Sequence, residues 1–226
     1  KKLTILTFIN GKSKENLTTE NCKDIGIHAA KMHNLTSGLS INRKNSLSVE
    51  SWRKIFTNIK DPCLKIHKDL PKLIENNLDD VEKNWPLKLP SGIIHADLFK
   101  DNIIFDKNKV NGIIDFTFSC NEFYAFEIAI CFNALCFDGH KNNLSFNVTK
   151  AKNFIDGYSS VRKISDEEKD KIKILSQGAA LRFLLTRVFD SLNTVDGAIV
   201  KVKDPLEYLK RLEFHKNSKN FEDYFF

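Results

Sequence analysis

The chain has 226 residues, of which 42% are hydrophobic and 18 are Phe, and its formal net charge is +6. This length allows one domain or two small ones, and the composition supports a sizeable core, which excludes an intrinsically disordered chain. The sequence holds no apolar run long enough to predict a membrane span, and its five Cys lack the spacing of a zinc site or a disulfide framework. We therefore expect reduced thiols, no membrane partner and a cytoplasmic location.

The positive charge permits an anionic ligand such as a nucleotide, and charge alone leaves a nucleic-acid binder open. The lysines are scattered among acidic residues along helical stretches, which is typical of a solvated surface. The Phe residues fall on apolar faces without interleaved basic residues, which indicates core packing and not base stacking. With no supporting motif, we expect no nucleic-acid partner.

The first half of the chain predicts one short strand and three helices. The apolar run 3–9 reads as a strand that the turn 10–12 closes. Thr18 or Thr19 is a suitable N-cap for a helix that runs to about residue 33. Two further helices, each with apolar residues at helical spacing and each ending before a proline, are expected over 48–60 and 70–85.

The hydrophobic period then changes from helical to extended. Short apolar runs occupy 92–95, 103–105 and 112–114, and the polar stretch 106–109 predicts a hairpin between the last two. Helices are expected again over 123–137, 146–161, 166–192 and 205–216. The sequence therefore predicts an α+β fold, mostly helical, with a small hairpin that carries polar loops.

Those loops hold the most informative residues of the chain. Asp97 is followed by Asn102 five residues later and by Asp115 eighteen residues later, and the last of these directly precedes a Phe. This order is typical of kinase-like folds, in which one carboxylate faces the attacking hydroxyl while an amide oxygen and a second carboxylate hold Mg²⁺. The sequence therefore predicts Asp97 as the catalytic residue and Asn102 and Asp115 as metal ligands, although the spacing alone would also fit an Asx-rich turn.

Each of three further polar residues has two possible roles. His95 precedes the catalytic loop and could bond the backbone or Asp115, so we expect it to support the loop and not to transfer protons. Arg182, in an apolar stretch, could form an ion pair with Asp190 or Glu127, or contact a substrate carboxylate. Asp138 could meet a substrate ammonium or cap a turn.

Arg187 lies one helical turn or so beyond Arg182 in the same expected helix. Its sequence surroundings favour an exposed position, and we predict that it lies on the surface.

Taken together, the motifs resemble the homoserine kinases of the aminoglycoside phosphotransferase and choline kinase superfamily. The matching pieces lie in order along essentially the whole chain, at residues 6–13, 95–102, 114–122, 133–138 and 180–183. The resemblance implies a protein-kinase-like fold and transfer of the ATP γ-phosphoryl group to the side-chain hydroxyl of L-homoserine, in threonine biosynthesis. ATP and Mg²⁺ are the cofactors it implies, and its small-molecule substrate is the expected partner; oligomeric state does not follow.

The resemblance also assigns supporting positions. The backbone of Thr7, Phe8 and Ile9 matches the hinge that meets adenine, and Ile114 falls at the nucleotide side of the metal loop. Glu127 stands where the superfamily usually carries an Asp tied to the catalytic-loop backbone.

Residues 1–12 then correspond to the end of an N-terminal-lobe strand and the hinge, and 13–226 to the helical C-terminal lobe. On this reading the phosphate-covering loop and the strand Lys of kinase-like folds have no counterpart in the sequence, so we expect the chain by itself to bind ATP weakly and to turn over slowly. Two alternatives stay open: a kinase for another hydroxyl compound, such as an amino alcohol or an aminoglycoside, and an inactive ligand-binding remnant.

Overall fold

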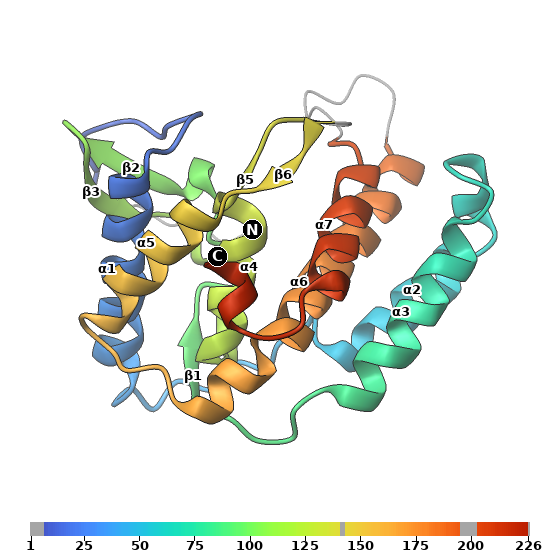
Figure 1. The fold of residues 1–226 in the computed structure, drawn as a ribbon, viewed down its shortest axis with the longest axis horizontal. Helices are drawn as coiled ribbons and strands as arrows, with labels where there is room; N and C mark the ends of the chain where they lie inside the picture. The colour runs from blue at the N-terminus through green and yellow to red at the C-terminus, as the bar shows by residue number, and fades with distance from the viewer. Residues whose placement is uncertain (1–6, 141–142, 195–202, 226) are drawn as a thin grey trace.

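The computed structural model describes residues 7–140, 143–194 and 203–225, which form a helical body with three small strand pairs (Figure 1). The helices are α1 (Thr19–Thr36), α2 (Val49–Ile59), α3 (Leu70–Asn84), α4 (Tyr124–Leu135), α5 (Val148–Ser159), α6 (Asp166–Leu192) and α7 (Leu206–Asn217). Each strand pair is antiparallel: β1 (Ser91–Ile94) with β4 (Cys120–Phe123), β2 (Ile103–Asp106) with β3 (Lys109–Ile113), and β5 (Phe137–Asp138) with β6 (Ser145–Phe146).

Two of the helices begin with reciprocal caps. Thr18 accepts from the backbone N–H of Asn21, whose side chain bonds back to the Thr18 N–H, and this fixes the start of α1. Ser165 and Glu168 make the same pair of contacts at the start of α6. Each cap satisfies two of the amide groups that a helix leaves free at its N-terminus.

The core lies around α4, whose side chains are almost all buried, and along the middle of α6. In Figure 1, α6 and α7 run side by side between α4 and the α2–α3 pair. Trp52 of α2 packs edge-on against Trp85, which in turn meets Phe126 of α4, so aromatic rings join the outer helices to the centre.

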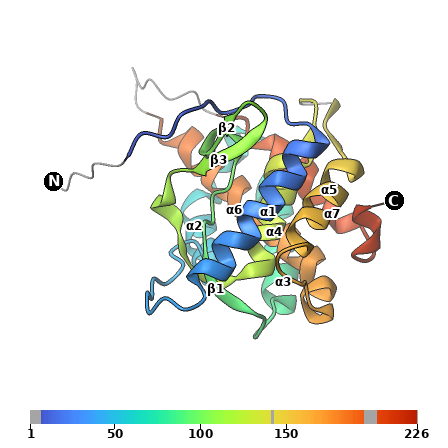
Figure 2. The same cartoon turned by 90° about the vertical axis from the view of Figure 1, so that its left-hand side faces the viewer.

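Helices α1 and α5 pack unusually closely on the other side of α4 (Figure 2). A Cβ at Gly26 would lie 2.1 Å from the carbonyl oxygen of Phe154, and a Cβ at Gly157 would lie 2.0 Å from that of Lys23. The two backbones approach to a distance that only glycine allows on both helices.

The predicted α+β class and the seven helices are confirmed, with ends that differ from the predicted ones by at most three residues. Part of the predicted strand 3–9 lies outside the described residues, and the part that is described, 7–9, has no strand pairing. The apolar run before Asp97 pairs with β4, a strand that the sequence did not predict, and residue 137 belongs to β5 instead of the preceding helix. None of the described helices could span a membrane.

Candidate active site

The strands bring the three predicted phosphoryl-transfer residues to neighbouring loops. Asp97 follows β1, Asn102 ends a short 3-10 helix just before β2, and Asp115 follows β3. The backbone N–H of Ile114 donates to the Asn102 carbonyl oxygen at 3.0 Å, which ties the start of the β2–β3 hairpin to its end. The hairpin therefore holds Asn102 and Asp115 side by side.

The Asn102 side chain is turned by its contact with the catalytic loop. Its Nδ2 donates to the backbone carbonyl of Asp97 at 2.8 Å and approaches the Asp97 Oδ2 at 3.4 Å. Because the amide nitrogen faces the loop, the amide oxygen Oδ1 is directed away from it. That oxygen is a neutral, hard ligand of the kind that Mg²⁺ accepts.

Asp115 has an unusual backbone that sets its side chain. Its φ of 62° and ψ of 65° lie in the left-handed region, and its Oδ1 accepts from the backbone N–H of Thr117 at 3.3 Å and from the Thr117 hydroxyl at 2.6 Å. These two hydrogen bonds hold the pKa of Asp115 below its usual range. The carboxylate stays charged, with its second oxygen open to a cation.

Asp97 lies in a different environment. Burial raises the pKa of its carboxyl above the usual value, while the positive charge of Arg182 and the His95 ring act in the opposite direction. The charge of Asp115 also reaches Asp97 and raises its pKa further. The two carboxylates share one electrostatic neighbourhood but differ in proton affinity, as a proton acceptor and a metal ligand should.

His95, the residue two before Asp97, makes two contacts that hold the loop around Asp97. The His95 Nε2 lies 2.8 Å from the Ile114 carbonyl oxygen, and its Nδ1 accepts from the Asp97 backbone N–H at 3.2 Å. Because Nε2 donates to a carbonyl oxygen and Nδ1 accepts from an N–H group, the neutral ring carries its proton on Nε2. Both ring nitrogens are therefore engaged with backbone groups, and the supporting role of His95 stays a prediction.

Helices α4 and α6 clamp the same loop. The Glu127 carboxylate accepts from the backbone N–H groups of His95 and Ala96, the latter at 3.1 Å, and Arg182 Nη1 donates to the Ala96 carbonyl oxygen at 2.6 Å. Ala96 itself has a φ of 65°, a strained value for a residue with a Cβ. The clamp holds the loop in a conformation that it would not adopt alone.

The contacts of Arg182 and Asp138 bear on the alternative roles predicted for these two residues. Arg182 is only 2% exposed, and its Nη1 bonds the backbone carbonyl of Ala96. Among the described residues it makes no ion pair with Asp190 or Glu127, and its contact with a substrate carboxylate stays a prediction. Asp138 pairs with Lys150 at 2.5 Å and accepts from the Asn147 side chain at 2.7 Å. These contacts show neither a turn cap nor a substrate ammonium, so both alternatives for Asp138 stay predictions.

The prediction for Arg187 is wrong. Its side chain is only 14% exposed, because the guanidinium lies over the ring of Tyr208, 4.4 Å from the centroid, and donates to the backbone carbonyl of Asp204 at 3.0 Å. The partners of Arg187 come from α7 and the residues just before it, so its neighbours along α6 could not reveal them.

The residues predicted for nucleotide binding lie on one side of the hairpin. The chain at 7–12 runs along β2 and β3 (Figure 2), where Lys12 pairs with Phe105 and the Ile9 side chain lies over Gly112. Thr7 and Phe8 are exposed, and the Ile114 side chain is 37% exposed. Ile9 and Ile114 thus flank the hairpin that carries the two predicted metal ligands.

Comparison with known proteins agrees with this geometry. Residues 2–162 match the model of the phosphotransferase enzyme family. The homoserine kinase of Mesorhizobium japonicum is 41% identical over 97% of this chain and 68% of its own length, and that of Bradyrhizobium diazoefficiens is 42% identical over 97% and 67%. The chain spans about two-thirds of the length of these relatives.

Solved structures with a similar fold are also kinases. Choline kinase from Cryptosporidium parvum has a TM-score of 0.64 at 18% identity, covering 92% of this chain and 68% of that one. Amicoumacin kinase hAmiN, solved in complex with AMP-PNP, Ca²⁺ and Ami, has a TM-score of 0.61 at 12% identity, covering 93% of this chain and 63% of that one. These likenesses confirm the kinase-like fold, and the chain belongs to the phosphotransferase enzyme family, within its homoserine kinase group.

Proposed function

We propose that this chain carries the phosphoryl-transfer centre of a homoserine kinase. In the reaction, the side-chain hydroxyl oxygen of L-homoserine forms a bond to the γ-phosphorus of ATP while the bond from that phosphorus to the β–γ bridging oxygen breaks. ADP leaves, O-phospho-L-homoserine forms, and the hydroxyl proton passes to a carboxylate and then to solvent.

Asp97 is the carboxylate in this proposal. Its raised pKa favours proton acceptance, and the contacts of His95, Glu127 and Arg182 around the loop fix its direction. Phosphoryl transfer depends mainly on such positioning, because the transition state is loose and the proton moves late. A well-placed general base of this kind contributes about 10²–10⁴-fold to the rate.

The donor set beside Asp97 fits Mg²⁺. Asn102 presents a neutral amide oxygen and Asp115 a carboxylate oxygen of lowered pKa, both hard ligands. When bound, Mg²⁺ neutralises charge on the phosphates of ATP.

The nucleotide would lie against the outer side of the hairpin. We place adenine at the backbone of Thr7, Phe8 and Ile9, with Ile114 facing the nucleotide near the metal. Under this proposal residues 1–12 act as strand end and hinge, and 13–226 as the helical lobe. The exposure of Phe8 and Ile114, both apolar, supports an occupant on this face.

The cysteines support a reducing, cytoplasmic setting for this chemistry. All five are buried and none is paired in a disulfide. Free thiols without disulfides are the usual state of proteins in the cytoplasm.

The observation that carries the proposal is the turned Asn102 amide, which frees one hard oxygen next to Asp115 while holding Asp97. The test is a coupled ADP-release assay on the full-length gene product, with L-homoserine, choline, ethanolamine and an aminoglycoside as separate acceptors. We expect kcat/KM for homoserine to exceed the others by at least tenfold. Preference for another acceptor would reassign the substrate. If no acceptor leads to ADP release, the result would support a non-catalytic remnant.

A further inference from the structure

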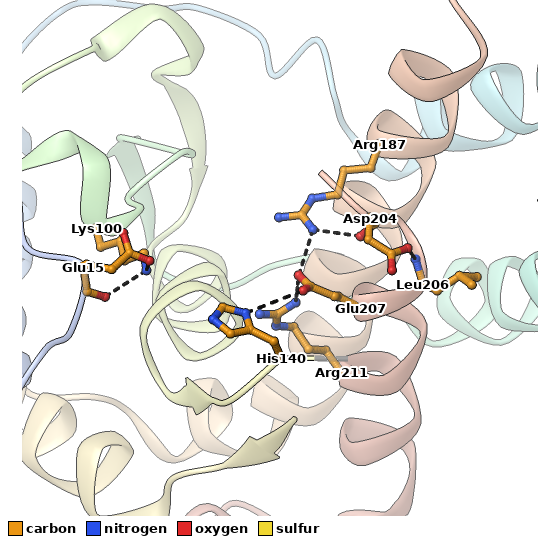
Figure 3. Close-up of polar contacts among 8 residues, drawn as sticks. All are labelled: Glu15, Lys100, His140, Arg187, Asp204, Leu206, Glu207 and Arg211. Carbon is orange, nitrogen blue, oxygen red and sulfur yellow. Dashed lines mark hydrogen bonds and ion pairs between the residues drawn. The ribbon is translucent and has the colours of Figure 1, made fainter. Parts of the chain in front are cut away.

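A second cluster of charged residues lies near the catalytic loop and takes no part in the chemistry described above. Arg187 of α6 donates to Glu207 Oε2 of α7 at 3.3 Å, and Arg211, one turn along α7, approaches the same oxygen at 3.7 Å. His140 Nδ1 approaches the other carboxylate oxygen of Glu207, Oε1, at 3.9 Å (Figure 3). We call Arg187, Glu207 and Arg211 the α6–α7 cluster.

Aromatic rings hold both guanidinium groups in place. Arg187 lies 4.4 Å and Arg211 4.6 Å from the centroid of the Tyr208 ring, and Arg211 also lies 5.2 Å from that of Phe137. Contacts between a guanidinium and a ring face stabilise the charge and restrict its rotamers. The two cations are therefore fixed before any ligand arrives.

The charges of this cluster do not balance. Two guanidinium groups share one carboxylate, and only the Arg187 contact with Glu207 is a hydrogen bond. Arg211 Nε and Nη1 and the Tyr208 hydroxyl are shielded from solvent and have no hydrogen-bond partner among the residues that the structure describes. Buried donors without partners cost about 1–3 kcal/mol each, and more when charged, so an anionic partner at this cluster would relieve a real penalty.

The cluster adjoins the reaction centre. The Tyr208 ring packs against Phe183 of α6, with ring centroids 5.4 Å apart, and Phe183 in turn packs edge-on against Phe99, two residues after Asp97, at 4.9 Å. Figure 3 shows the Arg187 side chain extending from α6 on the side that faces Lys100. Arg187 and Glu207 keep 14% and 19% of their side chains exposed, so a small molecule can reach them.

We propose that the α6–α7 cluster is the subsite for the head group of an α-amino acid acceptor. The α-carboxylate binds Arg187, with the charge of Arg211 behind it, and the α-ammonium binds Glu207. The acceptor hydroxyl is then directed toward Asp97. This assignment rests on the proposed function, since it names how the same site selects its substrate.

A hydroxyl compound that lacks a carboxylate leaves both arginines uncompensated at this subsite, and one that lacks an ammonium leaves Glu207 without its cation. A site with buried polar groups rejects analogues that fail to pair with them. The cluster therefore explains selection of an amino acid over a simple amino alcohol.

The test uses the full-length gene product with the changes Arg187→Gln and Glu207→Gln. KM and kcat are measured for L-homoserine and ATP, and inhibition constants against homoserine for two partial analogues. These are 4-hydroxybutyrate, which lacks the ammonium, and 3-aminopropanol, which lacks the carboxylate. Arg53→Gln is the matched control, because Arg53 pairs with Asp79 and Glu82 between α2 and α3.

We expect a crossed pattern. Arg187→Gln should raise the homoserine KM and the 4-hydroxybutyrate inhibition constant about 10–100-fold, as expected for loss of a charged hydrogen bond, and leave 3-aminopropanol within about threefold. Glu207→Gln should weaken 3-aminopropanol and spare 4-hydroxybutyrate. Arg53→Gln should change none of these constants. Circular dichroism and the melting temperature check that each variant is folded.

Several results would overturn the subsite while leaving the proposed function intact. Equal losses for both analogues, a raised ATP KM with an unchanged homoserine KM, or no inhibition of the unaltered enzyme by 4-hydroxybutyrate would each do so. If Arg187→Gln fails to fold, Arg187→Lys keeps the test: a point charge without the planar fork should still raise the homoserine KM severalfold. If the unaltered enzyme does not phosphorylate homoserine at all, the proposed function itself is wrong.

Discussion

Glu127 is the buried carboxylate on which the shape of the catalytic loop depends, and its removal gives the sharpest stability prediction. It is fully buried, burial raises its pKa, and its carboxylate accepts from the backbone N–H groups of His95 and Ala96. In Glu127→Ala both N–H groups lose their acceptor. An unpaired buried donor costs about 1–3 kcal/mol, which makes about 2–6 kcal/mol for the pair.

Urea unfolding of the 226-residue chain measures this cost. We expect the midpoint to fall with little change in the slope m, because the surface exposed on unfolding is nearly the same. Glu127→Gln should cost about half as much, since a neutral oxygen can still accept but charge-assisted bonds are roughly twice as strong. In the full-length protein Glu127→Ala should also lower kcat about a hundredfold, because displacing a reacting group by about 1 Å has that effect.

Glu168 provides the matched control. It is equally buried and accepts from the backbone N–H of Ser165, but it lies 14 residues before Arg182 on α6, about 21 Å along the helix. Glu168→Ala should lower stability and leave kcat within about threefold. If Glu127→Ala costs less than about 1 kcal/mol, or lowers kcat no more than Glu168→Ala does, the clamp argument is wrong.

Three further predictions follow from the site and the packing. Because burial raises the pKa of Asp97 and the reaction needs its carboxylate, kcat should fall as pH drops, with an acid limb above the usual aspartate value of about 4; a limb below it would contradict this. Thr117→Val removes the 2.6 Å hydrogen bond to Asp115 and should raise the Mg²⁺ concentration for half-maximal rate severalfold, whereas an unchanged Mg²⁺ titration would argue against Asp115 as a ligand. Gly26→Ala places a Cβ 2.1 Å from the Phe154 carbonyl and should destabilise the chain by about 3 kcal/mol in urea, so a neutral result would disprove the close packing of α1 and α5.

Much of the fold could be predicted from local pattern. The helix over 166–192 spans the predicted range, because both its apolar period and its N-cap Ser165 depend on residues that are neighbours in the sequence. Strand β4 was missed because apolar and polar residues do not alternate clearly along its four residues. Its position depends on pairing with β1 and on a bridge between Lys44 and Asn121. Pairing with distant segments leaves no local signal.

The candidate site divides in the same way. Asp97, Asn102 and Asp115 could be predicted because their order along one short segment reflects a single hairpin. The contact of Thr117 with Asp115 depends on the left-handed backbone at Asp115. The residue types at this place in the sequence do not predict that conformation. A Thr two residues after an Asp is the one sequence signal that could have suggested the turn.

The α6–α7 cluster was missed altogether. Arg187, Glu207 and Arg211 come from two helices, and only their packing around Tyr208 brings them together. In the sequence each one resembles a residue of a solvated helix face. Tertiary contacts alone distinguish them from the surface charges on either side.

The most direct test of the account is whether homoserine-dependent phosphoryl transfer needs Asp97. ³¹P NMR of the full-length protein with ATP, Mg²⁺ and L-homoserine should show O-phospho-L-homoserine, and Asp97→Asn should slow its formation by about 10²–10⁴-fold while the melting temperature stays within a few degrees. Product formation at the unaltered rate in Asp97→Asn would contradict the assignment of this loop as the reaction centre.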